Sequence, residues 1–167
     1  MQNTRSRSHA QQNKEAFSKK PNQNFYKINT NVNLSEANTW GLAAICRNEN
    51  SEVLAATKWR MMGFKLVTEF AAQCGFMDVI FESDNEKIIR VLTAKETIPN
   101  LYVGNVIIGI TLRKGRFRMV VFSHVDRKDN GLTHRLAQHA LTEPNKIWLE
   151  ETPSCIVTEV LWDIFNQ

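Results

Sequence analysis

The sequence predicts an α/β domain with a five-stranded mixed sheet flanked by helices. Three observations support this fold class: strand-like segments open the chain, helical spacing of apolar residues begins near residue 64, and short apolar strands then alternate with helices. The expected order is βββαβααβα, in which three antiparallel strands precede parallel crossover connections. A length of 167 residues suits one domain of ordinary size.

The first half of the chain should contain three strands. Apolar and polar residues alternate over residues 25–32, and apolar runs occupy residues 40–46 and 53–59. Turn-forming residues at 33–38 and 47–51 separate these segments. Because the connections are short, we expect an antiparallel meander.

The second half should alternate helices with single strands. Apolar residues spaced as in a helix predict a first helix over residues 64–74, and a short apolar strand follows at residues 79–81. A capping sequence then opens a second helix, with Ser83 or Asp84 as the residue that caps it. The last predicted elements are a helix, a strand and a helix over residues 101–112, 116–125 and 130–141.

Composition limits the class of protein. Hydrophobic residues make up 43% of the chain, which excludes a wholly disordered protein. The longest uncharged run, residues 97–112, is too short to cross a membrane, and the first residues lack an apolar leader segment. Three scattered cysteines without disulfide or metal-site spacing favour a reducing compartment. We therefore expect a monomeric nuclear or cytoplasmic protein that is not attached to a membrane.

Positive charge is concentrated at the N-terminus. Residues 1–23 hold five of the 21 Lys and Arg residues and one of the 17 Asp and Glu residues, a net charge of +4. The other 16 cationic and 16 acidic side chains balance over residues 24–167. The polar residues 1–23 are expected to form a disordered basic tail, and residues 24–167 the folded domain.

Several phrases that occur in order over residues 24–167 resemble those of one known family, the plant-type ribonuclease H-like domain. This family is related to type 1 ribonuclease H and to the domain that follows reverse transcriptases in retroelements. The matching phrases are Tyr26–Thr30, Trp40–Asn48 with Glu52–Ala56, Gly75–Asp84, and Phe122–Arg127 with Asn130 and His134–Ala137. The resemblance implies a ribonuclease H-like fold.

The resemblance also implies hydrolysis of the RNA strand of an RNA–DNA hybrid by two Mg²⁺ ions. Two such cations held close together need several charged oxygen ligands. Asp84 matches one acidic position of the family, but Asn31 and His134 stand at two others, and His124 matches a histidine that would shuttle protons. Asp84 is thus the strongest candidate for a metal ligand, although capping the next helix would also explain it.

The remaining acidic position falls in a segment that the chain lacks. The family places a Glu in an Ala-Glu-Ala phrase early in the first helix, and roughly ten residues around that phrase are absent, which implies a shortened first helix. Glu69 is the only candidate replacement, and it is more simply explained as a solvent-facing helix residue.

Basic residues near the last strand are candidates for nucleic-acid contacts. They are Arg113, Lys114, Arg116 and Arg118, with Arg127 and Lys128 further along the chain. Arg116 and Arg118 are expected on one face of the strand, where they would contact phosphates. The alternative is an ordinary solvated surface, which the neutral charge of residues 24–167 also permits.

Three functional hypotheses remain open. The favoured one is a degenerate ribonuclease H-like domain that binds nucleic acid, an RNA–DNA hybrid or RNA, and cleaves it little or not at all. The second is an active Mg²⁺-dependent hybrid endonuclease that has recruited Glu69. The third is a non-catalytic interaction domain or a decayed retroelement remnant.

Overall fold

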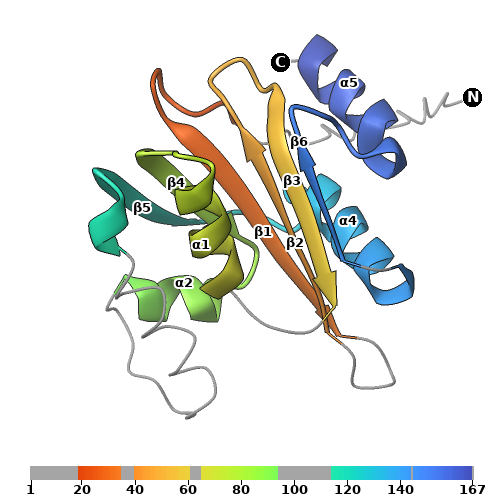
Figure 1. Ribbon diagram of the computed structural model, residues 1–167, viewed down its shortest axis with the longest axis horizontal. Coiled ribbons are helices and arrows are strands. Elements are labelled where there is room, and N and C mark those ends of the chain that lie inside the picture. The colour runs from red at the N-terminus through yellow and green to blue at the C-terminus, as the bar shows by residue number, and fades with distance from the viewer. Residues whose placement is uncertain (1–18, 35–39, 61–64, 94–113, 144, 167) are drawn as a thin grey trace, which may run out of the picture.

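The computed structural model describes residues 19–34, 40–60, 65–93, 114–143 and 145–166. These residues form one six-stranded mixed sheet with the strand order β5-β4-β1-β2-β3-β6 and helices on both faces (Figure 1). The helix expected over residues 101–112, the residue Arg113 and most of the basic tail lie outside the described residues.

The antiparallel meander predicted for the first half of the chain is confirmed. It consists of β1 (Tyr26–Leu34), β2 (Trp40–Arg47) and β3 (Val53–Arg60). Both pairings, β1 with β2 and β2 with β3, are antiparallel. Alternate residues of β2 serve the two faces of the sheet: Leu42, Ala44 and Cys46 enter one core, and Ala43 and Ile45 enter the other.

The predicted parallel crossovers are also present. After α1 (Lys65–Gln73), strand β4 (Asp78–Ser83) pairs in parallel with β1, and after α2 (Glu86–Leu92), strand β5 (Met119–His124) pairs in parallel with β4. The strand expected from residue 116 begins only at Met119, because Lys114–Arg116 form the 3₁₀ turn η1.

The prediction of five strands is wrong, because a sixth strand follows the helix α4 (Gly131–Thr142). This strand, β6 (Lys146–Leu149), pairs antiparallel with β3 at the edge of the sheet. It has only four residues, too few to show a clear alternation. A 3₁₀ turn η2 (Ser154–Ile156) and a final helix α5 (Val157–Asn166) complete the chain.

Two cores lie on opposite faces of the sheet. On one face α1 packs Val67, Phe70 and Ala71 against the sheet. On the other, α4 and α5 bury Leu136, Ala137, Ile156 and Val160 together with Trp148. Figure 1 shows α4 and α5 near β6 and α1 across β4 and β1. Among the described helices, none has the length and apolar character needed to span a bilayer.

Candidate active site at the ends of β1 and β4

Asn31 and Asp84 lie side by side where β1 and β4 run parallel. The register pairs Thr30 of β1 with Ser83, the last residue of β4. The next residue along each segment, Asn31 or Asp84, therefore lies beside the other. The Asn31 amide Nδ2 donates hydrogen bonds to both oxygens of the Asp84 carboxylate, at 3.0 and 3.1 Å. The prediction that these two residues are neighbours is therefore confirmed.

A second amide, that of Asn130, completes the surroundings of Asp84. Asn130 precedes α4 and is buried, and its Nδ2 donates to the Thr30 carbonyl oxygen at 2.9 Å and to Asp84 Oδ1 at 3.1 Å. The Asp84 carboxylate thus accepts three hydrogen bonds from two neutral side chains. Asn130 belongs to the last phrase of the family resemblance, but the sequence pattern predicted no site role for it.

The helix cap is a different residue from the one expected. Asn85 is the N-cap of α2, and its side-chain oxygen accepts a hydrogen bond from the Ile88 backbone N–H at 3.2 Å. Because neither Ser83 nor Asp84 fills this position, capping does not explain Asp84. Its carboxylate belongs to the cluster at the strand ends.

His134 extends the cluster into the first turns of α4. Its Nδ1 lies 3.4 Å from Asn31 Oδ1, and its Nε2 lies 3.2 Å from Gln138 Nε2 and 3.5 Å from a guanidinium nitrogen of Arg127. Amide and guanidinium nitrogens only donate, so we assign Nε2 of His134 as the acceptor and Nδ1–H as the donor to Asn31. Because the Asn31 Oδ1 accepts from His134, the NH₂ group of the same amide faces Asp84.

The other two predicted catalytic residues are His124 and Glu69. His124 ends β5 opposite Ser83 in the register, and its side chain is exposed. Glu69 lies on α1, which packs on the opposite face of the sheet from Asn31 and α4. Within the described ranges, no group of three or more His, Cys, Asp or Glu side chains is placed to hold a metal ion. The contacts at the strand ends thus bring together one carboxylate, two amides and one imidazole.

The basic residues fall into two separate places. Arg118 lies at the start of β4 and β5, where its guanidinium donates to Asp78 at 2.8 Å. This bond holds the pKa of Asp78 below its usual range and raises the pKa of Arg118. The expectation that Arg116 and Arg118 share a strand face is wrong, because both precede β5 and Arg116 belongs to η1.

Arg127 and Lys128 lie at the other end of the parallel strands, in a loop whose ends are hydrogen-bonded to Ser83 and Asp84. Both side chains are exposed in the loop between β5 and α4, and Arg127 approaches His134. Of the predicted nucleic-acid contacts, these two are therefore the ones placed beside the candidate site.

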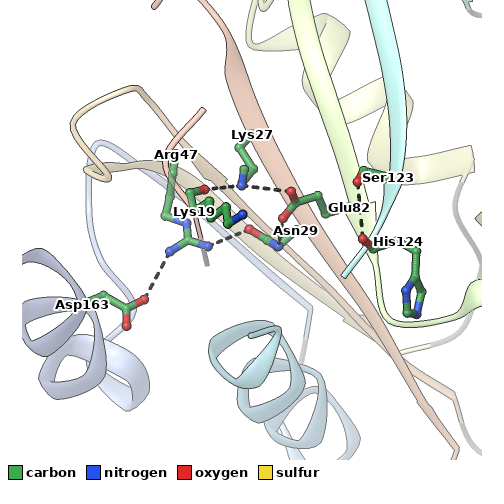
Figure 2. A network of polar contacts seen from close by, with 8 residues as sticks. All are labelled: Lys19, Lys27, Asn29, Arg47, Glu82, Ser123, His124 and Asp163. Carbon is green, nitrogen blue, oxygen red and sulfur yellow. Dashed lines mark hydrogen bonds and ion pairs between the residues drawn. The ribbon is translucent and has the colours of Figure 1, made fainter. Parts of the chain in front are cut away.

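A second, buried polar network joins side chains of β1, β2, β4 and α5 (Figure 2). The Lys27 ammonium group pairs with the Glu82 carboxylate at 2.9 Å. Asn29 Nδ2 donates a hydrogen bond to Glu82 at 2.9 Å, and Asn29 Oδ1 accepts one from the Arg47 guanidinium at 2.7 Å. Arg47 pairs with Asp163 of α5 at 3.3 Å, and Lys27 also donates to the Lys19 carbonyl oxygen. The network balances two positive and two negative side chains, and it engages Glu82, the carboxylate two residues before Asp84.

Burial shifts the pKa values of Asp163 and Arg47, the ion pair that joins this network to α5. Burial raises the pKa of Asp163, and the charge of Arg47 opposes this rise without cancelling it. Burial likewise lowers the pKa of Arg47, which Asp163 and Glu82 oppose. Burying the two charges of this pair therefore costs free energy of desolvation, which their mutual attraction offsets only in part.

The fold is similar to that of solved ribonucleases H. RNase H1 from the archaeon Halobacterium salinarum NRC-1 matches with a TM-score of 0.67 at 15% identity, over 71% of this chain and 98% of that chain. The N-terminal RNase H domain of Rv2228c from Mycobacterium tuberculosis matches with a TM-score of 0.66 at 16% identity, over 71% and 94% of the two chains. LC11-RNase H1, isolated from compost and solved in complex with an RNA/DNA hybrid, matches with a TM-score of 0.63 at 16% identity, over 70% and 96%.

The strand order and the helices on both faces define a ribonuclease H-like fold. The family model described as reverse transcriptase-like matches residues 29–140, and the chain belongs to this family. The match spans Asn31, Asp84, Asn130 and His134. A search of curated proteins gave no match.

Proposed function

We propose that this ribonuclease H-like domain binds nucleic acid, an RNA–DNA hybrid or RNA, without cleaving it by a two-metal reaction. One observation carries the proposal: the Asp84 carboxylate is hydrogen-bonded by the amides of Asn31 and Asn130. In a two-metal site, carboxylates face the cations; here the neighbouring side chains face Asp84 with N–H donors.

Charge supports the same conclusion. Two Mg²⁺ ions carry four positive charges, and hard cations of this kind need anionic oxygen ligands to stay close together. Asp84 supplies one negative charge, whereas Asn31 and Asn130 are neutral. A cation at Asp84 would also have to displace amide donors that His134 and the Thr30 carbonyl hold in place.

Support for nucleic-acid binding comes from the fold and from the loop before α4. The similar LC11-RNase H1 is described in complex with an RNA/DNA hybrid. In this chain Arg127 and Lys128 are exposed in the loop that ends at Asn130, a partner of Asp84, and their guanidinium and ammonium groups would contact phosphates. The basic residues before residue 19 would add affinity that depends on salt rather than on sequence.

The proposal is tested by the fluorescence anisotropy of a labelled RNA–DNA hybrid, measured over a range of salt concentrations. We expect salt-sensitive binding that weakens in the double variant Arg127→Ala/Lys128→Ala, with a log–log salt slope smaller by about two. Arg116→Ala, at the opposite end of the parallel strands, is the matched control and should change binding less. Absence of hybrid and RNA binding at low salt would contradict the proposal and favour a protein-interaction domain.

A further inference from the structure

The outer edge of the sheet at β6 has a self-complementary pattern. Strand β6 is the last strand of the sheet, so its outer side is unpaired among the described residues (Figure 1). Ile147 and Leu149 expose 50% and 63% of their surface, whereas Trp148 between them is only 6% exposed. Exposed edge strands with apolar side chains are templates for pairing with another chain.

The hydrogen-bond alternation of an antiparallel ladder shows which backbone groups of β6 point outward. The Glu150 N–H donates to the Leu54 carbonyl oxygen at 2.8 Å, and the register pairs Trp148 with Ala56 and Lys146 with Lys58. Since hydrogen-bonded and non-hydrogen-bonded pairs alternate, Lys146 and Trp148 direct their backbone groups toward β3. The N–H of Glu150, which follows the strand with a φ of 55°, points the same way. Ile147 and Leu149 therefore direct theirs away from the sheet.

We infer that a second copy of this chain pairs with β6 in antiparallel register, on a two-fold axis that passes through Trp148. In this register Ile147 lies opposite Leu149 of the other copy, and their outward N–H and carbonyl groups form the hydrogen-bonded pairs. Four exposed apolar side chains then cluster on one face of the joined sheet. The arrangement is isologous, as a closed dimer requires.

Charge complementarity favours a second copy as the occupant of this edge. The two-fold axis places Lys146 level with Glu150, the first residue after β6 in the other copy, so each of two symmetry-related positions brings opposite charges together. A lysine on an edge strand normally discourages pairing. Here the acidic residue four positions later provides its partner. This inference departs from the monomer expected from the sequence.

Sedimentation velocity of the full chain over a hundredfold range of concentration tests the inference. We expect a monomer–dimer equilibrium for the wild type. Lys146→Glu or Glu150→Lys alone places like charges opposite each other at both symmetric positions, and each should raise the dissociation constant about tenfold. An equimolar mixture of the two single variants restores opposite charges, so it should form a heterodimer with nearly wild-type affinity.

A second variant tests the backbone pairing. Ile147→Pro removes an N–H that points away from β3, a position where an edge strand tolerates proline, and it should abolish the dimer. Unfolding midpoints close to the wild-type value show that the variants are folded. A wild type that stays monomeric at the highest concentration, or a dimer that none of these variants weakens, would overturn the inference.

Discussion

At the scale of single residues, an amide in place of a carboxylate changes what the site needs. Two aspartates side by side would repel each other and would need cations between them. Asn31 instead donates to Asp84, and Asn130 donates from the start of α4, so the folded chain satisfies this carboxylate by itself. Hydrogen bonds to a charged group contribute about 1.5–3 kcal/mol each, which is large against the net stability of a domain.

The first prediction concerns Asn31→Asp, which exchanges the donor for a second negative charge. We expect the free energy of unfolding at pH 7 to fall by about 2 kcal/mol, because hydrogen bonds are lost and repulsion is gained. Urea unfolding measures this loss.

We also expect that Asn31→Asp gives no cleavage of an RNA–DNA hybrid, because Glu69 stays on the other face of the sheet. An Asn31→Asp variant that is as stable as wild type at pH 7 would show that the observed hydrogen bonds to Asp84 contribute little.

The second prediction concerns the buried pair Arg47–Asp163. Burial raises the folded-state pKa of Asp163 above its unfolded value of about 4, so the folded protein binds this proton more tightly than the unfolded chain does. Ionising Asp163 therefore lowers stability as the pH rises from the unfolded pKa through the folded pKa. Asp163→Asn removes this titration and should become more stable relative to wild type over that interval.

At pH 7 we expect Asp163→Asn to lie within about 1 kcal/mol of wild type, because the desolvation cost offsets most of the ion-pair attraction. Denaturant unfolding between pH 4 and pH 8 measures the effect, with the exposed Asp126→Asn as the matched control. A loss of several kcal/mol at pH 7 would show that the attraction exceeds the cost of burial.

At the scale of elements, long periodic segments were predictable and short or irregular ones were not. The meander and α4 followed from alternation and from helical spacing, because each element presents a clear apolar face. Strand β6 was missed because of its four residues only Trp148 is buried. The sequence did carry a signal for α5, since Val157, Val160, Leu161, Ile164 and Phe165 have helical spacing.

Tertiary packing explains the errors at the site. The residue that caps α2 is Asn85 rather than Ser83 or Asp84, because Asp84 is engaged by side chains from β1 and from the start of α4. These partners are remote in sequence, so local patterns could not reveal them. The proximity of Asn31 to Asp84 was predictable, because it depended only on the parallel pairing of two strands.

The third prediction concerns the close packing of α4 on β2. A Cβ atom added to Gly41 would collide with the Ala137 carbonyl oxygen and press on the Leu141 side chain. Gly41→Ala should therefore push the helix from the sheet and lower the free energy of unfolding by about 2 kcal/mol or more.

Gly131→Ala is the matched control, because a Cβ at that position meets no neighbouring atom and alanine favours a helix by up to about 1 kcal/mol. Thermal unfolding of both variants measures the difference. Equal midpoints would contradict the close approach of α4 to β2.

At the scale of the whole molecule, the segment that carries the excess positive charge overlaps the folded part of the chain. Within the predicted basic segment, residues 1–23, Pro21 is buried and the Lys19 carbonyl oxygen accepts a hydrogen bond from Lys27. These two contacts join the end of the segment to the domain. Composition located the excess charge but held no information on this contact with the buried network.

The fourth prediction uses this overlap. Deleting residues 1–18 removes three cationic side chains, Arg5, Arg7 and Lys14, and leaves the contact at Lys19 intact. If these cations contact phosphates, the log–log salt slope of hybrid binding should fall by up to about three, while the unfolding midpoint stays unchanged. An unchanged slope would place the phosphate contacts on the folded domain, with Arg127 and Lys128 as the first residues to substitute.

The most direct test of the central claim is single-turnover incubation of saturating protein with a labelled RNA–DNA hybrid and Mg²⁺, compared with Asp84→Asn. Asp84 is hydrogen-bonded by amides, and the described part of the chain places no group of three or more His, Cys, Asp or Glu side chains to hold a metal ion. We therefore expect the hybrid to remain intact and the two proteins to give identical traces. Mg²⁺-dependent cleavage by the wild type that disappears in Asp84→Asn would contradict the account.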